Sequence, residues 1–236
     1  MRHSTSTSIA GRFSILGMAF LGSVQAASTA EDFQTWSAIE AKGSLEVIHP
    51  DLKDFRYWLE GQGRFGNDTS SLSQGILRPG LGYSLNEHAS IWLGYAFVPT
   101  IEPFTDASYN ENRIWQQFLW TGKTSLGKFT SRSRFEERFT DQPDVAYRFR
   151  QLLKLSYPLD FAPDFRLVGS DEYFVNVNTT GMIDSGFDQN RAFAGIGYHF
   201  DENIEMEIGY MNQYIRRAER EDLMSHILSL NLQLDY

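Results

Sequence analysis

The last nine residues of the sequence alternate strictly between apolar and polar side chains. Leucines and a final aromatic residue occupy every second position from Leu228 to Tyr236, and every residue between them is polar. Because successive side chains of a β-strand point to opposite faces, the segment predicts a strand with one apolar and one polar face. Such a strand is typical of a transmembrane β-barrel, which has lipid outside and a polar lumen. The alternative is the last strand of a soluble β-sandwich.

The aromatic end of this strand also predicts how the protein is assembled. An aromatic last residue on an apolar strand face is what the outer-membrane assembly machinery commonly recognises. The predicted assembly signal consists of Leu230, Leu232, Leu234 and Tyr236. We therefore expect the barrel-assembly machinery to be a partner of the protein.

The first 26 residues have the pattern of a cleaved signal peptide. Arg2 and Arg12 give a basic start, Phe13 to Gly22 is a short apolar segment, and small residues precede the expected cleavage after Ala26. The apolar segment is too short to span a bilayer as a helix. The sequence therefore predicts a signal peptide over residues 1–26 and one barrel domain over residues 27–236.

Charge and cysteine content narrow the classes of function. Removing the predicted signal peptide removes two arginines and no acid, which leaves 19 Lys and Arg against 30 Asp and Glu. This acidic balance argues against a nucleic-acid partner. The sequence has no cysteine, so an exported form must be stabilised by its core or by a closed hydrogen-bonded barrel. No later segment is apolar for long enough to predict a transmembrane helix.

Alternating segments continue along the chain. Ten of them are readable from Phe55 onward, and residues 33–50, with a break at Gly43, add two shorter ones. Because bacterial outer-membrane barrels have an even number of strands, we predict an all-β, transmembrane, up-and-down antiparallel barrel of about 12 strands, with 10 as the alternative. Eleven strands would break this rule. The predicted connections alternate between short ones, near Asn86, Leu126, Pro158 and Asp201, and longer polar ones, near Pro99, Asn178 and Arg216.

Several segments resemble the domain of unknown function 2490 family of bacterial outer-membrane proteins. The resemblance runs over roughly Trp36 to Tyr236 and is carried, in the family's order, by Leu59 to Phe65, Glu111 to Arg113 with Trp115 to Gln117, Arg132 to Phe139, Tyr147 to Gln151, Asp171 to Asn176, and Phe187 to Arg191 leading to Gly195, Gly197, Gly209 and Tyr210. The resemblance implies a signal peptide and an outer-membrane β-barrel. The family has no established activity, so the resemblance implies a location and leaves the function open.

The polar faces of the predicted strands carry arginine and glutamate at matching depths. Together with Glu60, the predicted lumen ladder contains Arg64, Arg78, Arg113, Arg132, Arg134, Glu136, Arg138, Arg148, Arg150, Lys154, Glu172, Arg191, Glu205 and Glu207. Two interpretations remain open. The ladder is either a salt-bridged plug that fills a narrow barrel, or the lining of a narrow channel. Because ten basic groups outnumber five acids, an open lumen would favour small anionic solutes.

The alternative from another class is a lipid-modifying hydrolase. His88 and Ser90 form the His-x-Ser pattern of barrel hydrolases, but they lie at a predicted periplasmic turn, whereas such sites face the outer leaflet. Ser225 and His226 are adjacent, so their side chains point to opposite faces. We therefore predict no enzyme activity, no cofactor and no metal, since the five histidines include no pair at ligand spacing. The expected partners are outer-membrane lipid and lipopolysaccharide, around a monomer in the outer membrane of a Gram-negative cell.

Overall fold

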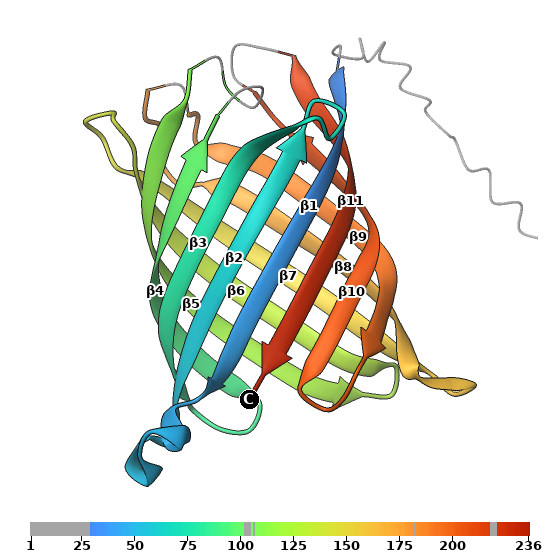
Figure 1. Cartoon of the computed structure of the whole chain (residues 1–236). Helices are drawn as coiled ribbons and strands as arrows, with labels where there is room; N and C mark the ends of the chain where they lie inside the picture. Colours follow the sequence, from blue (N-terminus) through green and yellow to red (C-terminus); the bar gives the residue numbers. More distant parts are fainter. Residues whose placement is uncertain (1–28, 102–104, 106, 182, 218–220) are drawn as a thin grey trace, which may run out of the picture.

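The protein is a closed β-barrel in which every strand pairs with its neighbours in the chain (Figure 1). The computed structural model describes residues 29–101, 105, 107–181, 183–217 and 221–236, so the predicted signal peptide lies outside the described residues. The described residues form eleven strands: β1 (Thr29–Ser44), β2 (Phe55–Gly66), β3 (Ser71–Ser84), β4 (Ala89–Thr100), β5 (Tyr109–Thr124), β6 (Gly127–Phe139), β7 (Ala146–Leu159), β8 (Ala162–Asn176), β9 (Gly186–His199), β10 (Ile204–Ile215) and β11 (Asp222–Asp235).

Two short 3-10 helices interrupt the meander between β1 and β2. They are η1 (Leu45–Val47) and η2 (Pro50–Leu52), and each begins after a residue whose side chain accepts a main-chain hydrogen bond. No helix among the described residues is long and apolar enough to cross a membrane.

The predicted strand number, 12 with 10 as the alternative, is wrong. The described residues include the ten strands expected from Phe55 onward, but residues 33–50 supply one further strand and not two. Gly43 does not interrupt that strand, because β1 stays paired with β2 as far as Ser44. A Cβ atom at Gly43 would lie 2.5 Å from the main-chain oxygen of Tyr236. The glycine therefore permits a close approach of two chain segments and does not mark a turn.

An odd number of strands makes the closing pair parallel. β1 and β11 run in parallel from the pair Thr29 and Asp222 to the pair Lys42 and Asp235. Beyond this pair, the Tyr236 N–H donates to the oxygen of Lys42 at 2.8 Å, and the Ser44 N–H donates to the oxygen of Tyr236 at 2.8 Å. The last residue of the sequence is thus bonded to the end of the first strand.

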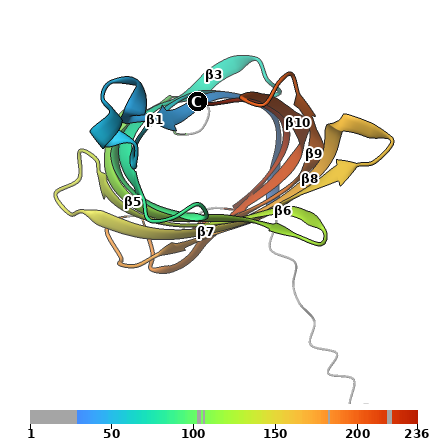
Figure 2. The same cartoon turned by 90° about the horizontal axis from the view of Figure 1, so that it is seen from below.

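The two ends of the barrel differ in their connections. The connections after β2, β4, β6, β8 and β10 lie at one end, which we call the loop end (Figure 1). The connections after β1, β3, β5, β7 and β9 lie at the other end together with Tyr236, and we call it the turn end. Figure 2 views the barrel along its axis and shows an oval ring of strands.

The polarity of the barrel is inverted relative to a soluble protein. Leu77, Leu81 and Leu93 are 53, 62 and 59 % exposed on the outside, whereas Arg134 and Glu136 are 0 % exposed inside. Soluble proteins place charged residues in water and bury them rarely. In this barrel the alternation along the strands leaves these leucines outside and sends Arg134 and Glu136 into the lumen, where some apolar side chains such as Trp115 are buried too.

Candidate functional site

A layer of charged side chains crosses the middle of the lumen. Its members are Arg and acidic side chains that project inward and are buried or half-buried. We call this set the arginine–glutamate layer, and it consists of Arg64, Arg78, Arg113, Arg132, Arg134, Arg138, Arg148, Arg150, Arg191, Glu60, Glu111, Glu136, Glu172 and Asp188.

Glu136 of β6 is the centre of the layer. Arg148 Nη2 and Arg150 Nη1, both from β7, each lie 2.7 Å from one of its carboxylate oxygens. Arg113 Nη1 of β5 approaches the same carboxylate at 3.9 Å. A fully buried carboxylate is costly unless charged hydrogen bonds surround it. Arg148 and Arg150 supply these bonds here, and Arg113 adds a third positive charge nearby.

Glu172 of β8 extends the network around the barrel. Arg132 Nη2 lies 2.7 Å away, Arg150 Nη2 lies 2.8 Å away, and Arg191 Nη1 lies 4.0 Å away from its carboxylate. Arg150 bonds both Glu136 and Glu172, so it connects the two carboxylates into one network. Strands β6 to β9 are therefore linked through their side chains as well as through their main chains.

Two acids of the layer were missed by the sequence analysis. Glu111 accepts from Arg113 Nε at 2.7 Å and from Arg138 Nε at 2.5 Å. Its position two residues before Arg113, on the same strand face, was a usable signal. Asp188 lies 3.1 Å from Arg148 Nη1. Asp188 is the residue left unpaired at a register shift between β8 and β9, and the sequence carries no signal for this shift.

The remaining predicted ladder residues also form ion pairs. In the middle of β3, Arg78 lies 2.5 Å from Glu60. Toward the turn end, Lys154 bonds Glu207, and Glu205 lies 3.5 Å from Arg166, which was not predicted. The structure thus places every predicted ladder residue on the lumen side, and among the described residues all but Arg64 and Arg134 have an opposite charge within 4.0 Å.

Arg134 is held by neutral and aromatic groups. Its Nε and Nη2 donate to Gln117 Oε1 at 2.8 and 2.6 Å. Its guanidinium carbon lies 4.7 Å from the ring centroid of Trp115 and 5.7 Å from that of Trp58. Trp58 and Trp115 belong, with Trp92, to a buried apolar cluster inside the barrel. Through Arg134, this cluster packs against the arginine–glutamate layer.

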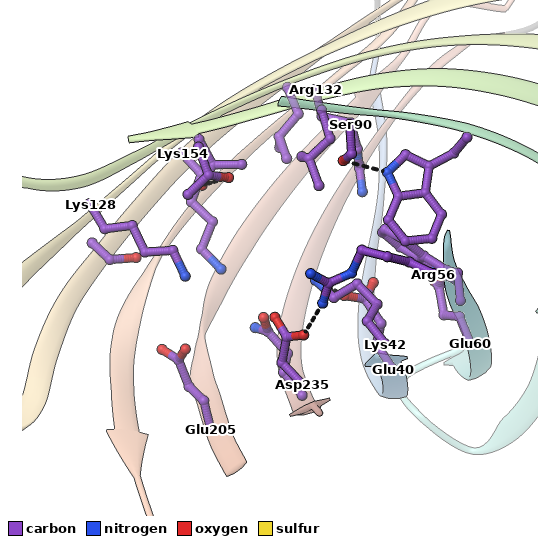
Figure 3. A pocket seen from close by; sticks show the side chains of 18 of the residues that line it. Glu40, Lys42, Arg56, Glu60, Ser90, Lys128, Arg132, Lys154, Glu205 and Asp235 are labelled. Atoms are coloured by element: carbon purple, nitrogen blue, oxygen red, sulfur yellow. Dashed lines mark hydrogen bonds and ion pairs between the residues drawn. The ribbon is translucent and has the colours of Figure 1, made fainter. Parts of the chain in front are cut away.

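Two cavities flank the layer among the described residues. The turn-side cavity, of about 390 Å³, has ion pairs between Glu40 and Lys42 at 2.9 Å and between Arg56 and Asp235 at 2.8 Å (Figure 3). The loop-side cavity, of about 290 Å³, is lined by different residues, including Trp36. Side chains at the centre of the layer and its aromatic neighbours line neither cavity: Arg134, Glu136, Glu172, Trp115 and Phe174.

In the structure, His88 and Ser90 of the predicted hydrolase pattern contact other residues and not each other. The Trp92 indole N–H donates to Ser90 Oγ at 2.8 Å, and His88 Nε2 lies 3.6 Å from Glu87. Ser225 is buried, whereas His226 contacts the Tyr210 hydroxyl at 2.6 Å on the outside. In the described part of the chain, no group of three or more acidic or histidine side chains is placed to hold a metal ion.

The predicted assembly signal lies at the turn end of β11. Leu230 and Leu232 pair with Ile208 and Met206 of β10, and Tyr236 is 58 % exposed. The polar residues Asn231, Gln233 and Asp235 line the turn-side cavity, together with Leu232. Recognition of this strand by the assembly machinery stays a prediction.

Comparison with known proteins agrees with the sequence resemblance. The sequence model of a family described as "Protein of unknown function (DUF2490)" matches residues 33–224. An uncharacterised protein of Methylorubrum extorquens (strain AM1) is 36% identical over 220 residues, which cover 91% of this chain and 92% of the relative. Neither match is described with an activity.

Proposed function

Because the chain belongs to the domain of unknown function 2490 family, whose description assigns no activity, we propose its function from the barrel itself. The protein is an outer-membrane β-barrel whose lumen is closed at mid-height, and it serves as a structural envelope barrel and not as an open pore. The observation that carries this proposal is the inverted polarity: exposed leucines outside and fully buried Arg134 and Glu136 inside.

Aromatic pairs near both ends support a position across a bilayer. At the turn end, the ring centroids of Phe165 and Tyr198 are 4.8 Å apart, and at the loop end those of Phe187 and Tyr214 are 5.9 Å apart. Membrane barrels carry such aromatic girdles at both interfaces. The strands contain 12 to 16 residues, and roughly 9–11 residues suffice to cross the hydrocarbon core.

The proposed orientation rests on the connections from β3 to β11, which have two to four residues at the turn end and six to nine at the loop end. The connection between β1 and β2, with η1 and η2, is a longer one at the turn end. Outer-membrane barrels have short periplasmic turns and longer outer loops. The proposed orientation therefore places the turn end, with Tyr236, in the periplasm and the loop end outside. In this arrangement Leu230, Leu232, Leu234 and Tyr236 act as the assembly signal, and the barrel is a monomer surrounded by outer-membrane lipid and lipopolysaccharide.

The arginine–glutamate layer supports a closed lumen over an open anion channel. A solute that passes between the two cavities must displace Trp115 or break the bonds of Arg150 to Glu136 and Glu172. Breaking one side of a buried ion pair costs about 3–5 kcal/mol. A passive channel with frequent openings would therefore require a second arrangement of the layer.

Planar-bilayer conductance of the refolded barrel tests the closed lumen. We expect no reproducible steps from wild-type protein whose folding is verified by heat-modifiable gel mobility. The double variant Trp115→Ala and Arg134→Ala removes the largest side chains of the closure, and we expect it to give steps. Steps from the wild-type protein with anion preference would refute the closed barrel and would support the channel.

The proposal includes no catalysis, and the hydrolase alternative has its own test. Ser90 lies in the turn-side cavity as the acceptor of the Trp92 indole N–H. Hydrolysis of phospholipid or lipid A by the folded wild-type barrel that is lost in Ser90→Ala would establish the alternative. We expect no such activity from either protein. Sucrose-gradient fractionation of cell membranes checks the location, and recovery in the inner-membrane or soluble fraction would refute it.

A further inference from the structure

The described lining of the loop-side cavity has more positive than negative side chains. Among the described residues that line it, eight are arginines and two are acids, Glu111 and Asp188. The carboxylates of the layer that lie deeper, Glu60, Glu136 and Glu172, reduce this imbalance without removing it. Over the described layer as a whole, nine arginines face five carboxylates.

Arg64 of β2 is the clearest uncompensated group in this cavity. It is 8 % exposed, and among the described residues it has no carboxylate within 4.0 Å. Its terminal nitrogens donate to the neutral amides Gln74 Oε1 at 2.6 Å and Gln62 Oε1 at 3.0 Å. Its Nε has no hydrogen-bond partner in the described part of the chain. A buried charge with an unsatisfied donor is costly unless a ligand or solvent ion compensates it.

A second unsatisfied donor and a fixed aromatic ring belong to the same cavity. The Nε of Arg78, which is 3 % exposed, also has no hydrogen-bond partner. The guanidinium carbons of Arg64 and Arg191 lie 3.9 and 4.9 Å from the ring centroid of Trp36. These contacts hold two guanidinium groups against one ring, so their donors are oriented before a ligand arrives.

The size and surroundings of the cavity define the ligand. A volume of about 290 Å³ lies at the lower end of the range of roughly 300–1,000 Å³ for small-molecule sites. Tyr109, Ile183 and Arg217 line it, so the cavity extends toward the loop end. Guanidinium groups present planar donor pairs that match the oxygens of phosphate and carboxylate groups. The excess of arginines over carboxylates favours a ligand with more than one negative charge.

We propose that the loop-side cavity is a binding site for a phosphate group, held by Arg64 and Arg78 beside the ring of Trp36. A phosphate carries about two negative charges near neutral pH, which fits the surplus of arginines. The group belongs either to a free phosphorylated compound or to the phosphorylated headgroup of lipid A. The first source requires only the folded barrel, whereas the second also rests on the proposed outer-membrane location.

Isothermal titration calorimetry on the barrel folded in nonionic detergent micelles at low salt tests the site. Inorganic phosphate is the first probe. We expect saturable binding to the wild-type protein and at least about a tenfold loss of affinity in Arg64→Gln, because hydrogen bonds to charged groups carry roughly that factor. Arg56→Gln, in the turn-side cavity, is the matched control and should bind phosphate as the wild-type protein does.

The second probe distinguishes the two sources of phosphate. Diphosphorylated lipid A and its dephosphorylated form are added separately in mixed micelles. Competition with inorganic phosphate by the phosphorylated form alone identifies the lipid headgroup, and no competition by either form identifies a free phosphate compound. Either outcome supports the site, provided that inorganic phosphate binds.

A measurement on the wild-type protein covers the case in which Arg64→Gln does not fold. Bound phosphate should raise the denaturant midpoint of the wild-type barrel, whereas chloride at equal ionic strength should not. Three results would overturn the proposal: no saturable phosphate binding, unchanged binding in folded Arg64→Gln, or equal stabilisation by chloride. None of them depends on whether the barrel conducts ions.

Discussion

Replacement of Glu136 by Gln removes the charge on which the arginine–glutamate layer most depends. Glu136 is 0 % exposed, Arg148 and Arg150 each approach it at 2.7 Å, and Arg113 approaches it at 3.9 Å. The Glu136→Gln side chain has nearly the same shape, so packing is preserved. The three arginines would keep their charges and lose the carboxylate that they share.

The expected loss of stability is large. Removing one partner of a buried ion pair costs about 3–5 kcal/mol, because the other charge stays buried without compensation. The amide can still accept one hydrogen bond, so we expect a value near the lower limit, about 3 kcal/mol. With a urea dependence of about 1–3 kcal/mol per molar, the unfolding midpoint should fall by about 1–3 M.

Urea titration of the barrel in detergent micelles, followed by tryptophan fluorescence, measures the effect. Glu87→Gln is the control, because its side chain is 84% exposed at a turn and should leave the midpoint unchanged. Arg134→Met makes the opposite comparison, because Arg134 is a buried charge without a carboxylate partner. Removing the charge is favourable, whereas losing two hydrogen bonds to Gln117 is unfavourable. We therefore expect the free energy of unfolding to change by at most about 1 kcal/mol. A loss below about 1 kcal/mol for Glu136→Gln would refute the argument that ion pairs stabilise the layer.

Two further changes test the closing pair of β1 and β11 and the outer face of the barrel. Gly43→Val should lower the free energy of unfolding by about 1–3 kcal/mol in the same titration, because its Cβ would lie 2.5 Å from the oxygen of Tyr236; an unchanged midpoint would contradict the observed closure. Leu77→Arg, on a side chain 53 % exposed in the middle of β3, should cost about 2–4 kcal/mol for the barrel in phospholipid vesicles. Leu85→Arg, beyond the end of β3, should cost at most about 1 kcal/mol, and equal costs would argue against a bilayer around β3.

Alternation predicted well which side chains point into the lumen and which point outward, because this depends only on strand geometry. The same rule that assigned Arg113 to the lumen would have assigned Trp115 and Gln117 there too, since all three share a strand face. The rule could not place Asp188, because this residue is left unpaired at a register shift between β8 and β9. Gly43 was misinterpreted for a different reason: a glycine needed for close approach and a glycine at a turn look identical in sequence.

Which charged residues form ion pairs was less predictable than which side of the strand they lie on. Alternation indicates that Arg150 points into the lumen, but it carries no information on which strand across the network supplies the carboxylate. In the structure Arg150 bonds Glu136 of the preceding strand and Glu172 of the following one. Arg64, with the same residue type and facing, bonds only amides. The difference between a structural ion pair and a candidate anion site therefore emerges only in three dimensions.

The odd number of strands in the described barrel has a consequence for its orientation. In a barrel with an even number, the first and last strands are antiparallel and both ends of the chain leave on the same side. Here β1 and β11 run in parallel, so Thr29 lies at the loop end and Tyr236 at the turn end. If the turn end is periplasmic, Thr29 must lie on the outside of the cell.

Cysteine labelling tests this orientation cleanly, because the natural sequence has no cysteine. Thr29→Cys is at the loop end, and Lys53→Cys is an exposed position beside η2 at the turn end. A large maleimide that does not cross the outer membrane should label Thr29→Cys in intact cells, and should label Lys53→Cys only after the outer membrane is permeabilised. The reverse pattern would invert the orientation and would place the loop-side cavity, with its unpaired Arg64, on the periplasmic side.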